Sequence, residues 1–487
     1  MKKIYESAKC LFLNAAILLT FSGILANCAS KQNLKNQEKK RITEVEKPNI
    51  LFIMVDDLGK EWISSYGADS IKTPAIDQMA SEGMKFHNAW SMPQCTPTRT
   101  ALLTGKYPWK QGWVNHWDVP RWGHGYFDWE LNKTFASYMR EAGYKTAAAG
   151  KWQINDFRLA PDAMKKHGFD EWLMWTGYET GIPASGERYW DPYINDIEGS
   201  KTYEGVFGPD MFTDFLIDFM KKNKNDPMMM YYPMVLTHGP LVHTPDEPYS
   251  KGKGRHGSMV RYTDKLVQKL LTAIDELEIT DKTMVIFTTD NGTDRSITGW
   301  RNGREVKGGK GTKVEAGVCE PFIVRWPGKI PAGSESYALT DFTDLLPTFL
   351  EIAGTSATDK ELDGTSILQV LLDKQKDTSR EWIMALGHGP GCLDDEGIRG
   401  INDYADRVIR DKEYKAWTEY DSKITRLHNI EDDPYEEVNL LGNLNAKDQK
   451  ALEKFQAILN LQPQRDGRPA YRPRAANEWD LTTRNCE

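Results

Sequence analysis

The 487 residues carry a formal net charge of −8, with 62 lysines and arginines against 70 aspartates and glutamates. This acidic balance lacks the basic excess of most nucleic-acid-binding proteins, so we expect no nucleic-acid partner. Hydrophobic residues make up 40% of the chain, enough for a sizeable core. Because one core rarely grows beyond roughly 250–300 residues, we expect a large domain with a smaller companion.

The N-terminus has the pattern of an export signal. Lysines precede the apolar run 10–26, which is interrupted by polar residues and falls short of the about 20 apolar residues of a membrane-spanning helix. The letters LANC at 25–28 resemble a bacterial lipoprotein cleavage box, in which Cys28 would be lipidated. Ordinary signal cleavage nearby, which would leave a soluble exported protein, is the alternative.

We therefore predict a signal peptide over 1–27 and a polar, flexible tether over 28–47. The mature protein would lie in the periplasm or on the cell surface, and would touch the membrane only through its lipid anchor.

The cysteines indicate no disulfide scaffold. Of the six, two fall in or beside the leader, and Cys95, Cys319, Cys392 and Cys486 remain. They form no CxxC pair, and no cysteine and histidine spacing suits zinc. One disulfide among the four is compatible with this pattern.

The body of the chain alternates buried apolar runs with amphipathic runs. We predict strands at 49–55, 145–149, 228–236 and 283–288, and helices at 73–83, 133–142, 209–222 and 258–277. A further helix begins within 93–105. Strands alternating with helices predict an α/β fold, with a large, mixed and mainly parallel sheet sandwiched by helices.

Beyond about residue 365 the pattern changes. Short hairpin strands are predicted at 407–410 and 414–417, followed by a helix at 446–459. These elements predict a smaller α+β subdomain over 366–487 and leave 48–365 as the main domain.

Polar residues follow the predicted strands at their carboxyl ends, where open α/β sheets bind their ligands. They are Asp56, Asp57, Lys151, His238, Asp290 and Asn291. Each alone would more often be a turn residue, a packed histidine or a surface cation. Together they offer several oxygen ligands, which suit a hard divalent cation, either Ca²⁺ or Mg²⁺.

The segment PQCTPTRTALLTG at 93–105 resembles the signature of the type I sulfatases, the formylglycine-dependent branch of the alkaline phosphatase superfamily. The segments NILFIMVDDLG, AAGKW, THGP, TTDNG and GGKGTKVEAG accompany it in the family's order. The resemblance covers about residues 48–365, and DPYEEVNL at 433–440 extends it toward the C-terminus. It implies an alkaline phosphatase-like fold and a sulfuric ester hydrolase.

The resemblance also implies that a maturation enzyme oxidises Cys95 to formylglycine. One hydroxyl of the hydrated aldehyde would attack sulfur and expel the alcohol. The other could then lose its proton and eject sulfate, which regenerates the aldehyde.

The remaining site residues follow from the same resemblance. Asp56, Asp57, Asp290, Asn291 and the modified Cys95 correspond to the metal ligands, here for Ca²⁺ with Mg²⁺ as the alternative. Arg99 would hold the diol, Lys151 and Lys310 would bind sulfate oxygens, and His238 would protonate the leaving oxygen.

One departure from the family concerns catalysis. The family usually has Gly-Lys-Trp-His, whereas this chain has Gln153 in place of the histidine. A glutamine forms hydrogen bonds but cannot accept a proton at neutral pH. Either another base serves sulfate elimination, or turnover is slower.

The expected substrate is a sulfated carbohydrate, inferred from the enzyme class and the exported location. Candidate substrate-binding residues are Gln153, His116, Arg121, His124, Arg188 and His243. Most tryptophans of the segment 107–129 are expected to be core. Two alternatives remain: a phosphodiester or phosphonate monoester hydrolase of the same superfamily, and a catalytically silent protein that binds sulfated glycans.

Overall fold

The computed structural model describes residues 47–116, 126–175, 177, 187–357, 362–387, 389, 391–472 and 486. The predicted signal peptide, the tether up to residue 46, Cys28, Arg121 and His124 lie outside these residues. The segment from Pro48 onward is one compact unit. No helix in the described part of the chain has the length and apolar character needed to span a bilayer.

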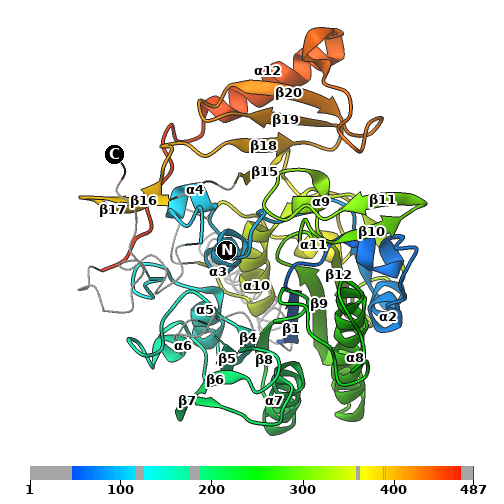
Figure 1. Ribbon diagram of the computed structural model, residues 1–487, viewed down its shortest axis with the longest axis vertical. Helices are drawn as coiled ribbons and strands as arrows, with labels where there is room; N and C mark the ends of the chain where they lie inside the picture. Colours follow the sequence, from blue (N-terminus) through cyan, green and yellow to red (C-terminus); the bar gives the residue numbers. More distant parts are fainter. Residues whose placement is uncertain are drawn as a thin grey trace, which may run out of the picture. The chain divides into compact units, whose positions relative to one another are not determined.

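A ten-stranded sheet forms the centre of this unit (Figure 1). Its order is β13 (Ser334–Ser336), β2 (Met84–Phe86), β12 (Phe322–Arg325), β9 (Thr283–Thr289), β1 (Asn49–Val55), β8 (Met228–Pro233), β4 (Lys145–Lys151), β5 (Glu171–Trp175), β6 (Tyr193–Asp196) and β7 (Gly199–Thr202). The strands from β9 to β5 are parallel to one another, whereas β12, β6 and β7 run antiparallel to their neighbours. The predicted mixed, mainly parallel sheet is confirmed.

The central strand β1 shows why its sequence is apolar without interruption. Its seven residues NILFIMV are all buried, as expected for a strand covered on both faces. Ile50, Phe52 and Met54 belong to one hydrophobic cluster, and Leu51, Ile53 and Val55 belong to the other. Alternating side chains of the same strand therefore anchor two cores.

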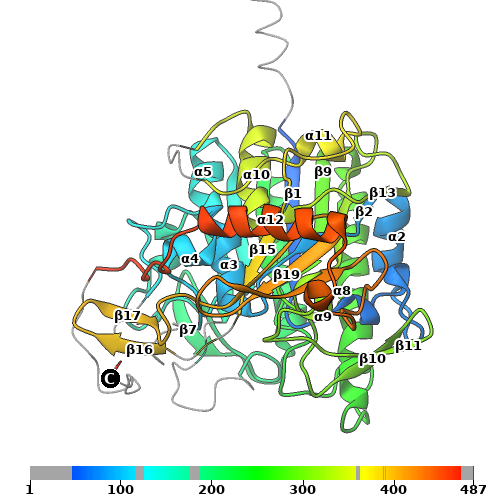
Figure 2. The same cartoon turned by 90° about the horizontal axis from the view of Figure 1, so that it is seen from above.

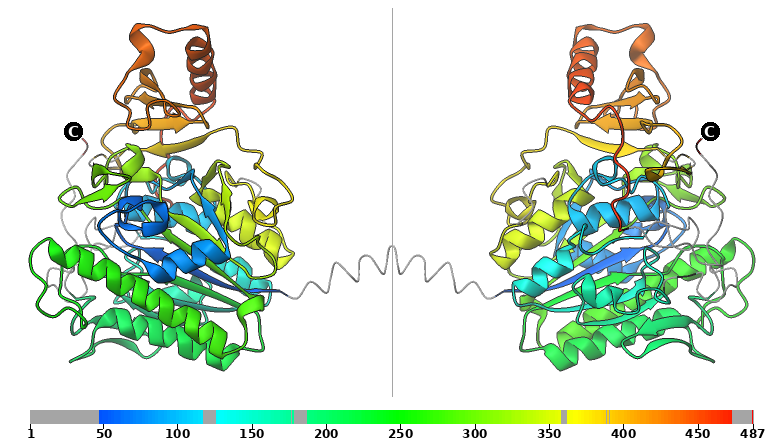
Figure 3. Two further views of the ribbon diagram at one scale, coloured as in Figure 1. Left: turned by 90° about the vertical axis from the view of Figure 1, so that its right-hand side faces the viewer. Right: turned by 90° about the vertical axis from the view of Figure 1, so that its left-hand side faces the viewer.

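Helices cover both faces of the sheet (Figures 2 and 3). One face packs against α2 (Pro74–Glu82), α7 (Gly208–Asn223) and α8 (Gly254–Glu276), and the other against α3 (Cys95–Thr104), α5 (Phe135–Glu141) and α10 (Leu345–Ala353). The shorter helices are α4 (Pro108–Gln111), α6 (Ala163–Lys166), α9 (Glu315–Val318) and α11 (Leu368–Leu371).

The predicted elements are present, with small shifts at their ends. The helix predicted over 258–277 begins earlier, at Gly254, and the strand β8, predicted to reach residue 236, ends at Pro233. Proline has no N–H to continue a ladder of hydrogen bonds, so a strand seldom runs past it. The chain then turns toward His238.

A second sheet lies in the C-terminal part of the chain (Figure 1). Its order is β15 (Ile383–Leu386), β18 (Arg407–Arg410), β19 (Tyr414–Thr418) and β20 (Ile424–Asn429). The helix α12 (Ala446–Asn460) packs on β19 and β20. The smaller α+β subdomain is thus confirmed, while its boundary at residue 365 stays a prediction.

The remaining strands form small pairs. They are β10 (Thr298–Arg301) with β11 (Arg304–Lys307), β3 (Ala89–Trp90) with β14 (Thr340–Asp341), and β16 (Gly391–Asp394) with β17 (Gly397–Gly400). A disulfide joins Cys392 of β16 to Cys486, while Cys95 and Cys319 are free.

Candidate active site

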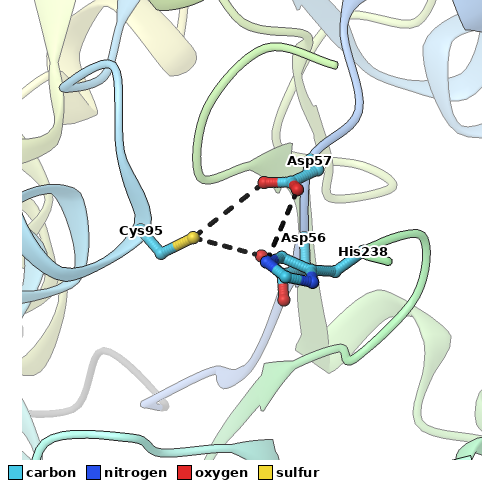
Figure 4. Close-up of side chains that lie close together, drawn as sticks. All are labelled: Asp56, Asp57, Cys95 and His238. Atoms are coloured by element: carbon cyan, nitrogen blue, oxygen red, sulfur yellow. Dashed lines mark hydrogen bonds and ion pairs between the residues drawn. The ribbon is translucent and has the colours of Figure 1, made fainter. Parts of the chain in front are cut away.

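The carboxyl ends of β1 and β9 bring three carboxylates to the N-terminus of α3. Asp56 and Asp57 directly follow β1, Asp290 follows β9, and Cys95 is the first residue of α3. The Cys95 thiol lies 3.4 Å from Asp56 Oδ1 and 3.9 Å from Asp57 Oδ1 (Figure 4). All four side chains are buried.

Each carboxylate has a cationic partner. Lys151, at the end of β4, places Nζ 2.8 Å from Asp56 Oδ2, and Lys310 places Nζ 2.6 Å from Asp57 Oδ2. Arg99, one turn after Cys95, places Nη2 2.6 Å from Asp290 Oδ2. Buried charges persist only when paired and hydrogen-bonded, so the three cations hold the carboxylates in place.

The surroundings of Asp56 and Asp290 shift the pKa values of these two carboxyls in opposite directions. Burial acts to raise the pKa of Asp56, but the charges of Lys151, Arg99 and Lys310 contribute to holding it well below its usual range. Burial and the neighbouring Asp56 charge raise the pKa of Asp290 to about 6. The carboxylates are therefore crowded enough for additional positive charge to stabilise them.

The site also contains an unsatisfied oxygen. Asn291 donates from Nδ2 to Asp57 Oδ1 at 2.7 Å, while its own Oδ1 is buried and has no hydrogen-bond partner among the described residues. A buried acceptor without a donor is costly unless it binds a ligand. With three carboxylates beside it, this amide oxygen fits a hard divalent cation.

His238 lies directly beside these carboxylates, in the site where the sequence predicted it. Its Nε2 is 3.7 Å from Asp57 Oδ2, and it joins Asp56, Asp57 and Cys95 in a cluster of candidate metal-binding atoms within 4.8 Å of one another (Figure 4). Burial and the nearby Lys310 lower the pKa of His238 well below its ordinary value. The imidazole is therefore neutral near pH 7.

Arg188, a candidate substrate-binding residue, is buried within the same cluster. Its Nη1 lies 3.5 Å from Asp56 Oδ2, and its Nη2 lies 3.0 Å from His238 Nδ1 and donates to Gly239 O at 3.1 Å. Its guanidinium also lies 4.2 Å from the Trp175 ring centroid. These contacts place it against a carboxylate and the histidine.

The other described candidates lie on nearby loops. His116 Nδ1 is 2.9 Å from the hydroxyl of Thr96, the residue after Cys95. His243 stacks on Trp190, with ring centroids 5.2 Å apart. Gln153 lies two residues after Lys151 with a positive φ of 67°. Among the tryptophans expected in the core, Trp109 and Trp113 are buried.

Two threonines that support the site were not singled out from the sequence. Thr98 donates its hydroxyl to Asp290 O at 2.7 Å, and Thr237 donates to Asp57 O at 3.1 Å. Both belong to segments that carry the family resemblance. A threonine in such a motif gives no signal of its own, because the hydroxyl is useful only when the fold supplies its partner.

Comparison with known proteins identifies the family. Residues 48–355 match the Sulfatase family, and residues 310–462 match the family described as N-sulphoglucosamine sulphohydrolase, C-terminal. The chain therefore belongs to the sulfatase family.

Individual relatives agree with this assignment. N-acetylgalactosamine-6-sulfatase of Canis lupus familiaris is 33% identical over 353 residues, which cover 67% of this chain and 66% of that enzyme. Arylsulfatase A of Bos taurus is 28% identical over 492 residues, which cover 90% of this chain and 92% of that protein.

A solved structure extends the similarity to the fold of nearly the whole chain. The crystal structure of Ps i-CgsB superposes with a TM-score of 0.73 at 26% identity, covering 88% of this chain and 95% of that one. The same protein has been solved in complex with k-i-k-neocarrahexaose.

Replacing Gln153 by histidine tests the departure from the family pattern. We expect Gln153→His to preserve or raise the rate of sulfate release, because it supplies a proton acceptor two residues from Lys151. Histidine also tolerates the positive φ of this position better than most residues. Steady-state kinetics of the purified variants would measure the change, with Gln153→Asn as the control that supplies no base. Inactivation by histidine would mean that the site uses Gln153 in a different arrangement.

Proposed function

We propose that the protein is a sulfuric ester hydrolase that releases sulfate from sulfated carbohydrates. The observation that carries the proposal is the placement of Cys95. It begins α3 within the family signature, and its thiol lies against the carboxylates of Asp56 and Asp57. The names of the relatives support a carbohydrate substrate, since one is an N-acetylgalactosamine-6-sulfatase and another was solved with a neocarrahexaose.

In this proposal residue 95 is the nucleophile after maturation to formylglycine, whose hydrate supplies a hydroxyl that a thiol does not. Asp56, Asp57, Asp290 and Asn291 would hold a divalent cation, Ca²⁺ or Mg²⁺, which would lower the pKa of that hydroxyl and neutralise charge on the sulfate. Arg99 positions this end of α3 through its ion pair with Asp290.

The cationic side chains would bind and orient the sulfate group. The ammonium groups of Lys151 and Lys310 each lie beside a different aspartate, Asp56 and Asp57. Both can donate to sulfate oxygens as negative charge develops on them. His238 would protonate the departing sugar oxygen, and because its imidazole is neutral in the free site, it would first take up a proton as the anionic substrate binds.

An exported location agrees with the chemistry of the cysteines. Disulfides persist mainly in oxidising compartments, and the structure pairs Cys392 with Cys486. With the leader over 1–27 and the lipoprotein box at Cys28, this supports a lipid-anchored protein of the periplasm or cell surface.

The test is sulfate release by protein purified from a host that matures such signatures. Inorganic sulfate would be measured with 6-sulfated N-acetylgalactosamine oligosaccharides and neocarrahexaose, and the released alcohol with a phosphate diester and a phosphonate monoester. We expect turnover of a sulfated sugar, together with a peptide spanning residues 86–99 whose mass shows an aldehyde or its hydrate at Cys95. A large preference for the diester or the phosphonate would identify a different hydrolase. Glycan binding without sulfate release, with Cys95 matured, would identify a silent binder.

A further inference from the structure

A second polar cleft lies outside the cluster around Cys95. Its volume is about 520 Å³, within the range of small-molecule sites, and it contains none of the metal-site residues. Its walls come from five parts of the chain: the segment after β1, the two residues after β2, the β10–β11 hairpin with the neighbouring α9, the end of β18, and the loop that follows β20. Figure 1 shows this hairpin beside α9, below the C-terminal sheet.

From this cleft we propose that the protein has a second carbohydrate site, which binds a sulfated saccharide without cleaving it. The class of ligand rests on the proposed function, whereas the location rests on the cleft itself. Three features of the walls support it: an arginine with unused donors, an exposed aromatic ring, and an excess of positive charge.

Arg301 is anchored but retains unused donors. Its Nε donates to Tyr66 O at 2.9 Å, which fixes the guanidinium at the end of β10. Neither Nη1 nor Nη2 has a hydrogen bond or ion pair with the described part of the chain. A held guanidinium with four free N–H groups suits bidentate binding of an oxyanion such as sulfate.

One aromatic residue of the cleft, Tyr435, provides a surface for a sugar ring, and Trp300 is exposed on the neighbouring hairpin without lining the cleft. Tyr435 lines the cleft and is 46% exposed, and the guanidinium of Arg304 lies 3.8 Å from its ring centroid. Arg304 is itself held by Glu437 at 3.2 Å. Trp300 is 48% exposed and pairs across the hairpin with Glu305, so the two share one face. Aromatic side chains with one open face present flat apolar area beside polar groups, which matches the two kinds of surface on a saccharide.

The carboxylates of the cleft are mostly engaged by the protein. Glu315 pairs with Arg410 at 2.9 Å, Glu436 pairs with Lys415 at 2.7 Å, and Glu61 accepts from Thr293 at 2.5 Å. The carboxylate of Glu305 has no hydrogen-bond or ion-pair partner among the described residues, and Glu61 has no cationic one.

The cations of the cleft are less fully engaged. Lys60 donates to His87 O and to the Cys319 thiol, and no carboxylate of the described chain lies within 4.0 Å of its Nζ. His87 itself pairs with Glu335. Arg301 and Lys307 have no ion pair with the described residues. Three cations therefore stand against two carboxylates without a cationic partner among the described residues, Glu305 and Glu61, a balance that favours an anionic sugar over a neutral one.

The experiment uses the full chain with Cys95→Ala, which prevents turnover of the ligand. Isothermal titration would count binding sites for k-i-k-neocarrahexaose and for a chondroitin 6-sulfate hexasaccharide, each compared with its desulfated form. For at least one sulfated probe we expect two sites. One of them should weaken at least tenfold on adding Tyr435→Ala or Arg301→Gln. Tyr435→Phe should retain it, as should Tyr249→Ala, a control at a tyrosine that is 89% exposed and outside the cleft.

Several outcomes would overturn the inference. They are a single site with affinity unchanged by the cleft variants, equal binding of desulfated probes, and no binding of either probe. Failure of the proposed function would look different, because it is measured as sulfate release by the matured protein with Cys95 intact. That protein could release sulfate without a second site, or bind at the cleft without releasing sulfate.

Discussion

Cys95→Ala should reduce sulfate release by a factor of about 10⁴ or more, the scale on which removing a catalytic nucleophile acts in other hydrolases. Alanine leaves nothing to mature into an aldehyde, so only binding and charge stabilisation would remain. The fold should persist, because Asp56 keeps its ion pair with Lys151 and Asp290 keeps its ion pair with Arg99. Sulfate release under saturating substrate and a thermal melt of the same preparation would measure both effects.

The matched control is Cys319→Ala. Cys319 is the other free and buried cysteine, and its thiol contacts Lys60 rather than the carboxylates of the site. It should lose little activity. Turnover of the Cys95 variant within tenfold of the parent would exclude residue 95 as the nucleophile.

Removing divalent cations should abolish sulfate release and lower the melting temperature by a few degrees, and adding Ca²⁺ should reverse both. The reason is that Asp56, Asp57 and Asp290 are buried side by side, with the unsatisfied oxygen of Asn291 next to them. An ion present at 100 times its dissociation constant would add about 2.7 kcal/mol to the free energy of unfolding. Melts in chelator, in Ca²⁺ and in Mg²⁺ would also show which ion binds.

The variant Asp57→Asn tests whether the stabilisation by the cation arises at the cluster of Asp56, Asp57 and Asp290. The variant should lose most of the stabilisation by the ion, whereas Asp246→Asn should keep it. Asp246 is exposed and pairs with Lys265 at 2.6 Å, away from the cluster. Identical melts of the parent protein with and without each ion would argue against a bound cation.

The sequence predicted the sheet and the main ligands because both depend on local patterns. Apolar runs such as 49–55 indicate buried strands, and the aspartates that follow them must meet at one edge of a parallel sheet. The family motifs then identified Cys95, Lys151 and Lys310, which the structure places around those aspartates.

Other features could not be predicted because they depend on contacts between distant residues. Arg188 reaches Asp56 across 132 positions of sequence, and no local pattern indicates that pairing. The second cleft joins residues from 60 to 436. The pairing of Cys392 with Cys486 was one of several combinations that four cysteines allow.

The loop between Asn291 and α9 limits which substitutions an enzyme with this site can accept. A Cβ on Gly292 would lie 1.8 Å from Ala316 O, and one on Gly309 would lie 2.4 Å from the carbonyl carbon of Ala316. The backbone beside Asn291 and the backbone that carries Lys310 are therefore fitted directly against one turn. If every single substitution were tested, this polar loop should accept as few of them as a hydrophobic core does. Changes of substrate would then have to arise elsewhere, in segments whose backbones are free to move without disturbing the ligands.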